Sequence, residues 1–256
     1  MKLFPQFPVQ SCAIALLICF RAGAQSAEPI LTWNAIPNPA GVVSLKLDFV
    51  SPLDETGGTS TQAIPVSRLE LGLGHGLEML FQIPLLRASQ PDGSSVLGGG
   101  QFSLALRYRL LGSRSSRFAM SIAGRLEVPS GDSALVGNAT QLMPMLLSEW
   151  RMNSEVSFRS NVSWNTTVGA TNGRFANFQH SHAVVWSLNR FAIPVFEVAG
   201  STSTLTGNSQ IVVQPELIVA PAQHLEFKTG LSVTLVPTPH YGIRSQLAWF
   251  WGKRSR

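Results

Sequence analysis

The most constraining feature of this chain is a pair of long alternating segments near its C-terminal end. Between His224 and Val236, every second residue is apolar or threonine, and the residues between them are charged, small or polar. The segment from Tyr241 to Trp251 repeats the pattern. A period of two is typical of β-strands with two unlike faces. Each arm has about 11 to 13 residues, more than the ~5–6 of a soluble strand and close to the ~9–11 tilted residues that cross a bilayer. We therefore interpret this hairpin as membrane-spanning.

The same alternation recurs along most of the chain, in about twelve segments bounded by turn residues. The expected strands are Gly41–Val50, Val66–Leu73, Leu77–Leu86, Gln101–Leu110, Arg117–Val128, Gln141–Arg151, Glu155–Val168, Gln179–Leu188, Ala192–Gly200, Gln210–Ala220, His224–Leu235 and Tyr241–Trp251. We predict an all-β fold: a closed, antiparallel, up-and-down transmembrane β-barrel of about twelve strands. The last segment should pair with the first and close the barrel.

Composition agrees with a barrel and excludes a helical membrane protein. Charged residues make up 13% of the 256 residues, against about 25% in soluble domains. The mean hydropathy is only +0.17, so the apolar residues are dispersed through the sequence. Beyond residue 24 there is no run of the ~18 apolar residues that a transmembrane helix needs.

The lengths of the connections alternate. The residues 51–65, 87–100, 129–140, 169–178 and 201–209 form longer links, and 74–76, 111–116, 152–154, 189–191 and 221–223 form shorter ones. Only 237–240 is short for its side. Outer-membrane barrels have short periplasmic turns and long external loops. We therefore expect both termini on the periplasmic side, and aromatic girdles at the strand ends.

The N-terminal residues read as a secretory signal peptide over 1–24. Lys2 supplies the positive charge, an apolar run follows from Cys12 to Phe20, and Ala22 to Ala24 fits a cleavage site. We expect a periplasmic lead-in over 25–40, the barrel over 41–251 and a basic tail over 252–256. Both cysteines lie in the signal peptide, so the mature chain is neither a thiol enzyme nor a disulfide scaffold.

If apolar side chains face lipid, the other parity faces a lumen. That parity carries charges of both signs, which should pair across strands. The candidate lumen-lining residues are Glu70, Glu78, Arg107, Arg109, Arg125, Glu127, Glu149, Arg159, Glu197, Glu216, Glu226, Lys228 and Arg244. We expect Glu226, Lys228 and Arg244 to lie near Lys46 and Asp48 at the closing seam.

Two features bear on the width of the lumen. Proline cannot donate a ladder hydrogen bond, so Pro144, Pro194 and Pro215 in mid-strand predict bulges or kinks. About eight strands fill their own interior and about sixteen leave an aqueous channel, so twelve lie between these cases. We predict a narrow pore, or a cavity plugged by charged side chains or by residues 25–40.

We find no catalytic, cofactor-binding or metal-binding constellation. His180 and His182 share a strand face without a third ligand, and Ser181 points to the opposite face, so no local nucleophile–base pair forms. The glycines of 72–76 join two strands with no following helix, which is a tight turn and not a dinucleotide loop. The computed pI of 9.8 comes from scattered basic residues, so we expect no nucleic-acid partner.

Several short motifs resemble a known family. They are Arg68–Met79, Gly99–Leu111, Leu126–Asp132, Pro194–Glu197, Gln214–Glu216 and Trp249–Trp251. They are similar to the outer-membrane proteins named for the meta-cleavage (MetA) pathway of phenol degradation, a family broadly related in concept to hydrophobic-compound transporters. The resemblance implies a barrel and the uptake of small apolar or aromatic compounds.

Taken together, these features predict a monomeric protein of the bacterial outer membrane that forms a narrow channel or transporter for small molecules. Its expected partners are outer-membrane lipids, the barrel-assembly machinery and a small-molecule solute, without a cofactor. One alternative is a non-conducting envelope barrel whose external loops bind a partner. Another is an enzyme at the barrel rim.

Overall fold

The structure is a computed structural model. It describes residues 32–53, 60–89, 94–132, 139–168, 176–189, 192–236 and 239–252. The expected signal peptide, residues 25–31 of the lead-in and residues 253–256 of the tail lie outside the described residues. Among the residues described, no helix is long and apolar enough to cross a membrane.

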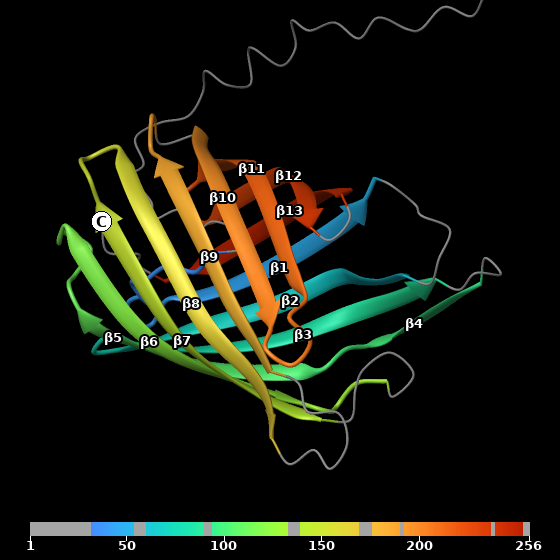
Figure 1. Cartoon of the computed structure of the whole chain (residues 1–256). Helices are drawn as coiled ribbons and strands as arrows, with labels where there is room; N and C mark the ends of the chain where they lie inside the picture. Colours follow the sequence, from blue (N-terminus) through green and yellow to red (C-terminus); the bar gives the residue numbers. More distant parts are fainter. Residues whose placement is uncertain are drawn as a thin grey trace, which may run out of the picture.

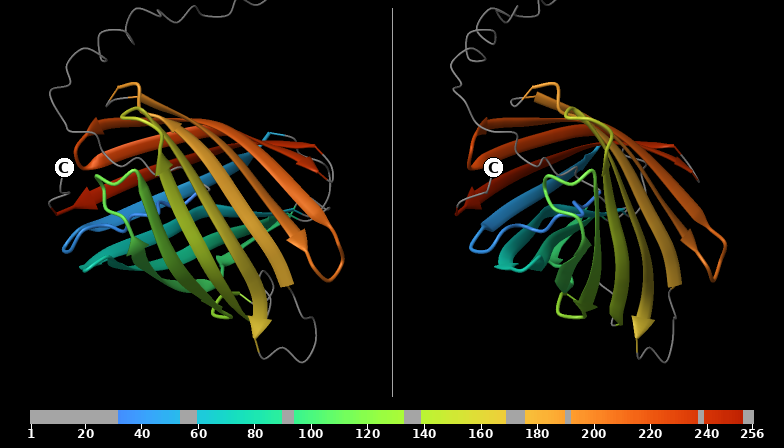
Figure 2. Two further views of the ribbon diagram at one scale, coloured as in Figure 1. Left: turned by 60° about the vertical axis from the view of Figure 1, so that its left-hand side comes forward. Right: turned by 90° about the vertical axis from the view of Figure 1, so that its left-hand side faces the viewer.

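The described chain is built from antiparallel strands that curve around one interior (Figures 1 and 2). The strands are β1 (Val43–Pro52), β2 (Ser60–Gly74), β3 (Leu77–Ser89), β4 (Ser95–Gly99), β5 (Phe102–Leu111), β6 (Phe118–Val128), β7 (Thr140–Arg151), β8 (Val156–Val168), β9 (Ala176–Trp186), β10 (Ala192–Ser203), β11 (Ser209–Ala222), β12 (Leu225–Val236) and β13 (His240–Trp251).

Twelve of these strands close into a barrel. Each strand pairs with its neighbours in chain order, β3 pairs with β5, and β1 pairs with both β2 and β13. The closing register joins Val43 to Trp251 and Pro52 to Gly242, which confirms the predicted seam. Asp48 pairs with Gln246, and Gln246 with Lys228, so Asp48 and Lys228 lie at the same level of the seam on either side of β13. Closure leaves no free sheet edge among the twelve described strands of the ring, which a protein in lipid requires.

Two elements differ from the sequence prediction. A loop was expected over residues 87–100, but part of this range forms the short strand β4. This strand pairs only with the end of β3 and is not one of the twelve strands of the ring. The strand β2 begins at Ser60 instead of Val66. Its register shifts between Ala63 and Val66, next to Pro65. This irregularity interrupts the alternation and hides the first part of the strand from a period-two search.

The predicted bulges at Pro144, Pro194 and Pro215 are wrong, because no residue is inserted at any of them. Each proline keeps a partner in one neighbouring strand, and the register of Pro144 against β8 and of Pro215 against β12 has the same offset before and after the proline, although the proline itself has no partner there. An inserted residue would turn all following side chains to the other face of the barrel. In this barrel that would expose buried charges to lipid. Losing the hydrogen bond of one missing N–H is the smaller cost, so the strands continue in register through proline.

The connections alternate in length as predicted from β1 to β9, but the links after β9 and β10 have five residues each. The turns after β2, β5, β7, β9 and β11 are short and lie at one end of the barrel, and the links after β1, β6, β8 and β10 lie at the other end. The N-terminal segment before β1 and the end of β13 belong to the short-turn end. This asymmetry is typical of outer-membrane barrels.

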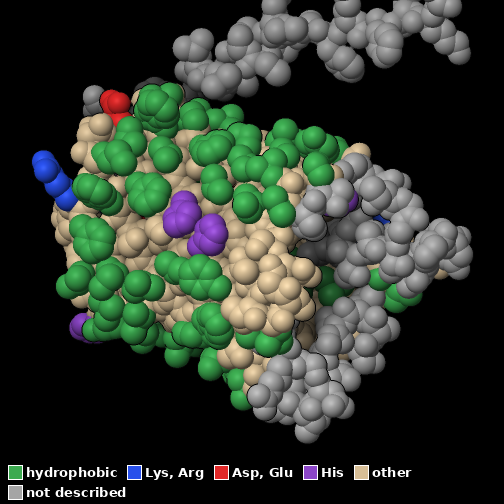
Figure 3. All heavy atoms as spheres, in the orientation of Figure 1, with side chains coloured by type: hydrophobic (Ala, Val, Ile, Leu, Met, Phe, Trp, Pro, Cys, Tyr) green, Lys and Arg blue, Asp and Glu red, His purple; other side chains and the backbone are tan. Residues whose placement is uncertain are grey.

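The strand residues whose side chains point outward are mostly apolar, as a lipid-facing surface requires. Figure 3 shows hydrophobic side chains spread over one side of the barrel. Aromatic side chains gather near the two ends. Near the short turns the exposed residues are Phe118, Trp150, Trp186, Trp249 and Trp251, and near the long loops they are Phe49, Trp164, Phe178 and Tyr241. Such girdles mark the two membrane–water interfaces.

Arginine at Leu231 should destabilise the barrel by about 2–4 kcal/mol, because this outward residue of β12 lies in the apolar band. Leu235→Arg is the matched control. Leu235 is also exposed but lies beyond the level of Tyr241, where the cost falls to about 0–1 kcal/mol. Urea unfolding in the presence of lipid vesicles measures both. Equal losses at the two positions would contradict the assigned membrane depth.

Candidate functional site: the barrel interior

The interior carries a network of buried charges that begins on β1, β2, β3 and β5. Lys46 Nζ lies 2.6 Å from Glu70 Oε1, and Arg68 Nε lies 3.4 Å from the same oxygen. On the next strands, Arg107 Nε donates to Glu78 Oε2 at 2.7 Å, and a second guanidinium nitrogen also pairs with that carboxylate. All these side chains are buried. The pairing offsets the large cost of removing each charge from water.

A second group of charges lies on β6, β7 and β8. Glu149 is approached by Arg159 Nε at 3.4 Å and by Arg151 Nε at 3.2 Å. Arg125 and Glu127, two residues apart on β6, form an ion pair and are less buried. Of these contacts, the one between Arg159 and Glu149 joins two neighbouring strands, β8 and β7, on the inner face.

A third group lies on β10, β11 and β12. Gln214 Nε2 lies between two carboxylates, 3.5 Å from Glu197 Oε2 and 3.2 Å from Glu216 Oε2. Lys228 Nζ is 4.0 Å from Glu226 Oε2. These side chains are also buried. The amide of Gln214 therefore bridges two acidic groups, a role that the sequence prediction missed because glutamine carries no charge.

Two of the candidate lumen residues stand apart from these groups. Arg109 is half-buried beside the β2–β3 turn, where its N–H donates to the carbonyl oxygen of Gly76 at 2.9 Å. Arg244 is half-buried on β13, and among the described residues its guanidinium forms no ion pair within 4.0 Å. The other eleven candidates belong to the paired groups.

A further element of the interior is residues 32–38, which we term the inner segment. Thr32 to Pro37 are largely buried, and their contacts are with inward-facing residues of the wall. Ala35 and Ile36 form an apolar cluster with Ala119, Ala123 and Leu147. The described part of the expected lead-in therefore packs inside the barrel.

Hydrogen bonds from several strands hold the inner segment. The Thr32 N–H donates to Glu197 Oε1 at 2.8 Å, and Arg107 Nη1 donates to the Asn34 carbonyl at 2.6 Å. The Ser121 hydroxyl donates to the carbonyl of Ala35. At its far end, Asn38 Nδ2 donates to Glu78 Oε1 at 2.7 Å. Because these partners come from β3, β5, β6 and β10, the segment crosses the interior from one wall to another.

The chain leaves the interior by passing very close to β2. A Cβ atom built on Gly72 would lie 1.9 Å from the carbonyl oxygen of Pro39. The Gly72 N–H donates to the Val42 carbonyl at 2.8 Å, and the Gly41 N–H donates to the Gly72 carbonyl at 3.0 Å. Only glycine allows this close backbone approach.

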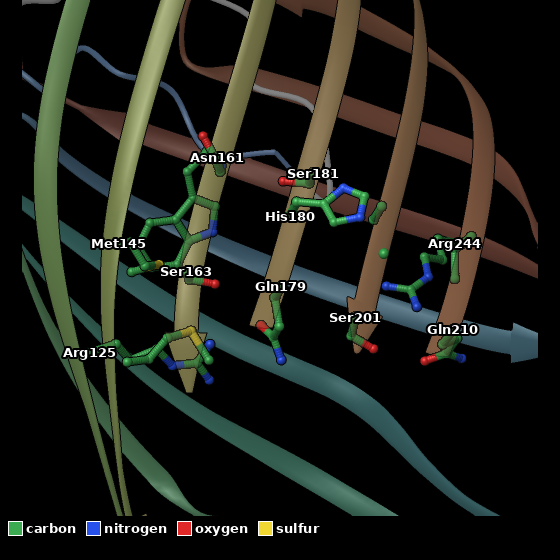
Figure 4. Close-up of a pocket in the computed structure, with 15 residues that line it drawn as sticks. Arg125, Met145, Asn161, Ser163, Gln179, His180, Ser181, Ser201, Gln210 and Arg244 are labelled. Atoms are coloured by element: carbon green, nitrogen blue, oxygen red, sulfur yellow. The ribbon is translucent and has the colours of Figure 1, made fainter. Parts of the chain in front are cut away.

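On the long-loop side of the inner segment the barrel interior forms a half-open cavity of about 420 Å³ (Figure 4). Trp33 of the inner segment lines it, together with Met143 and Met145 of β7. Arg125 and Arg244 lie on opposite sides, and Figure 4 shows both guanidinium groups directed into the space between them. A narrow pore or a plugged cavity was expected from the strand number, but the residues that line this cavity were not, because they come from strands that are distant in the chain.

Trp33 is held in place from several sides. The Arg68 guanidinium carbon lies 5.8 Å from the centre of the indole ring, within cation–π range. When the Asn161 amide is oriented to satisfy both of its polar atoms, its nitrogen donates to the Trp33 carbonyl at 3.2 Å. Trp33 and Met145 both pack against the apolar cluster that contains Ala35 and Ile36. A side chain fixed in this way offers a rigid apolar wall to the cavity.

His180, Ser181 and His182 do not form a nucleophile–base pair. His180 and His182 face outward with ring centres 5.2 Å apart, whereas Ser181 is buried on the inner face. Ser181 therefore cannot pair with either imidazole, as the alternation predicts. Within the described part of the chain, no group of three or more histidine, cysteine, aspartate or glutamate side chains could hold a metal ion.

Neither a protein-family model nor a curated protein sequence matches the chain. Solved structures do match its fold. An outer-membrane channel from Pseudomonas putida F1 has a TM-score of 0.70 at 9% identity, over 88% of this chain and 100% of that chain. The NanC porin has a TM-score of 0.57 at 7% identity, over 81% of this chain and 98% of that chain. The KdgM porin has a TM-score of 0.55 at 9% identity, over 82% and 99% respectively. The chain therefore has the β-barrel fold of outer-membrane channels and porins.

Proposed function

We propose that this protein is a narrow outer-membrane channel or transporter for small molecules, including apolar and aromatic ones. The observation that carries the proposal is the cavity of about 420 Å³ inside a closed, lipid-facing barrel. Such a volume is in the range of ligand-sized pockets. The apolar and aromatic part of the proposal is supported by the motifs that resemble the MetA phenol-degradation family, and by Trp33, Met143 and Met145 in the cavity wall.

The proposal includes the route of the protein to the membrane. Residues 1–24 act as a cleaved signal peptide, the barrel-assembly machinery inserts the chain, and the mature protein works as a monomer among outer-membrane lipids. The apolar outer face and the aromatic residues near both strand ends support the membrane location.

We assign the thirteen candidate charged residues to the wall of the solute path. Alternating charges of both signs keep such a lumen wettable, and their mutual pairing fixes the wall. The inner segment narrows the path, so the conductance should lie well below that of a general porin of about sixteen to eighteen strands.

Solute flux into proteoliposomes tests the proposed function. Liposomes that contain the folded barrel should admit small solutes faster than protein-free liposomes, and larger oligosaccharides should be excluded. Heat-modifiable migration in gels verifies folding in the same samples.

A folded barrel that admits no small solute would contradict transport. It would favour the non-conducting barrel with partner-binding loops, which the packed inner segment also suits. Hydrolysis of lipid or peptide substrates by the same preparation would instead favour an enzyme at the rim.

A further inference from the structure

We infer that the interior cavity is a binding site for a small organic anion that has a flat apolar body. This inference rests on the proposed function, because it names the class of solute that the channel would select. It depends on the charge of the cavity wall, the unpaired state of one arginine and the apolar surface beside it.

The charged residues that line the cavity are all cationic. Arg125 and Arg244 belong to the wall, and none of the described residues that line it is an aspartate or a glutamate. Elsewhere in the interior acidic and basic side chains alternate, as in the Lys46–Glu70 pair. The cavity is therefore a local region of positive charge within a lumen of mixed charge, and the low dielectric of its walls strengthens the attraction of an anion.

Arg244 is the stronger of the two anion-binding candidates. Its Nε atom is shielded from solvent and has no hydrogen-bond partner among the described residues. The carboxylates whose charge influences Arg244 most are Glu197 and Asp48. Glu197 accepts the Thr32 N–H at 2.8 Å, and Asp48 accepts a hydrogen bond from the Gln246 amide and lies 3.9 Å from Arg68. Both acidic groups are thus held by other partners, and the Arg244 fork remains available to a ligand carboxylate.

Arg125 supplies a weaker second charge. It already forms an ion pair with Glu127, a neighbour on the same strand. Its guanidinium still points into the cavity from the side opposite Arg244 (Figure 4). We therefore assign the ligand carboxylate to Arg244 and a long-range electrostatic contribution to Arg125.

The rest of the wall fits the body of such a ligand. Trp33 offers a rigid aromatic surface, and Met143 and Met145 offer thioethers that adapt to flat apolar groups. Ser201 and Gln210 add neutral polar groups on the side nearer the long loops. A carboxylate attached to one or two fused rings satisfies the cationic and the apolar parts of the wall together.

Equilibrium dialysis of the purified, full-length mature barrel in nonionic detergent tests the inference. The probes are 2-naphthoate, the neutral 2-naphthamide and the cationic 2-naphthylmethylammonium, which share one ring system and differ in charge. Empty micelles correct for partition into detergent. At low salt we expect naphthoate to bind most tightly, naphthamide more weakly and the ammonium compound least.

Two variants locate the site. Arg244→Gln should weaken naphthoate binding about 10- to 100-fold, the range expected for the loss of a charge-assisted hydrogen bond, and should leave naphthamide binding unchanged. Arg151→Gln is the matched control, because it removes a cation near the short-turn end, where Arg151 pairs with Glu149 at 3.2 Å. It should not change naphthoate binding.

The results separate this inference from the proposed function. Equal binding of the three probes, or equal weakening by Arg151→Gln and Arg244→Gln, would overturn the anion site even if liposome flux is observed. Charge-selective binding that depends on Arg244, found together with an absence of flux, would support the site and refute transport.

Discussion

Replacing Glu78 with leucine is expected to lower the free energy of unfolding of the barrel by about 3–5 kcal/mol. Glu78 is fully buried and accepts hydrogen bonds from Arg107 Nε at 2.7 Å and from Asn38 Nδ2 at 2.7 Å. Its removal leaves the buried Arg107 guanidinium without its acidic partner. The change is measured by reversible urea unfolding in the presence of lipid vesicles, with tryptophan fluorescence as the signal.

A double-mutant cycle separates the ion pair from its surroundings. The Glu78→Leu/Arg107→Met variant should recover most of the lost stability, because replacing both members of a buried pair by apolar groups is often neutral. Glu155→Gln is the surface control, since Glu155 is exposed in the β7–β8 turn and should have an effect near zero. A Glu78→Leu loss no larger than that of Glu155→Gln would show that the pair does not hold the wall together.

Deleting residues 32–37 should raise the single-channel conductance several-fold. The segment fills part of the interior through the Ala35 and Ile36 cluster and through hydrogen bonds to Glu197 and Arg107. Its removal vacates space in a twelve-stranded barrel, whose bare interior lies between a filled eight-stranded barrel and an open porin. Recordings in planar lipid bilayers measure the conductance.

Trp33→Ala provides the graded comparison for the deletion. This variant removes one large side chain but keeps the hydrogen bonds to the Thr32 N–H and to the carbonyls of Asn34 and Ala35. It should raise the conductance less than the deletion does. If the deletion variant folds and conducts like the unmodified barrel, the inner segment does not limit the current.

Most of the barrel could be predicted from the sequence. The alternation in segments such as 225–236 identified the strands. The alternating lengths of the connections predicted that the short turns lie together at one end of the barrel. The same alternation placed Glu226 and Lys228 among buried residues and Leu231 among exposed ones. These predictions succeed because the direction of a side chain in a strand depends only on its position in the period of two.

The candidate site was only partly accessible from the sequence. The charged residues that face the interior could be named, but the hydrogen bonds that the uncharged Gln214 and Asn38 donate to carboxylates could not be predicted. The proline bulges were wrong for a related reason. The prediction considered only the N–H that proline lacks, whereas the register depends on the pairing of the whole strand. The register has the same offset before and after Pro215.

The sequence by itself thus determined the strands, their inner and outer faces and the closing pair of β1 with β13, because alternation and turn residues are local properties. Only the tertiary structure decided the path of the inner segment and the position of the cavity. The Thr32–Glu197 hydrogen bond joins residues 165 positions apart, and Arg125 and Arg244 face one space from β6 and β13. Contacts between residues so distant in the sequence depend on the stagger of all the strands around the closed barrel, which no single segment encodes.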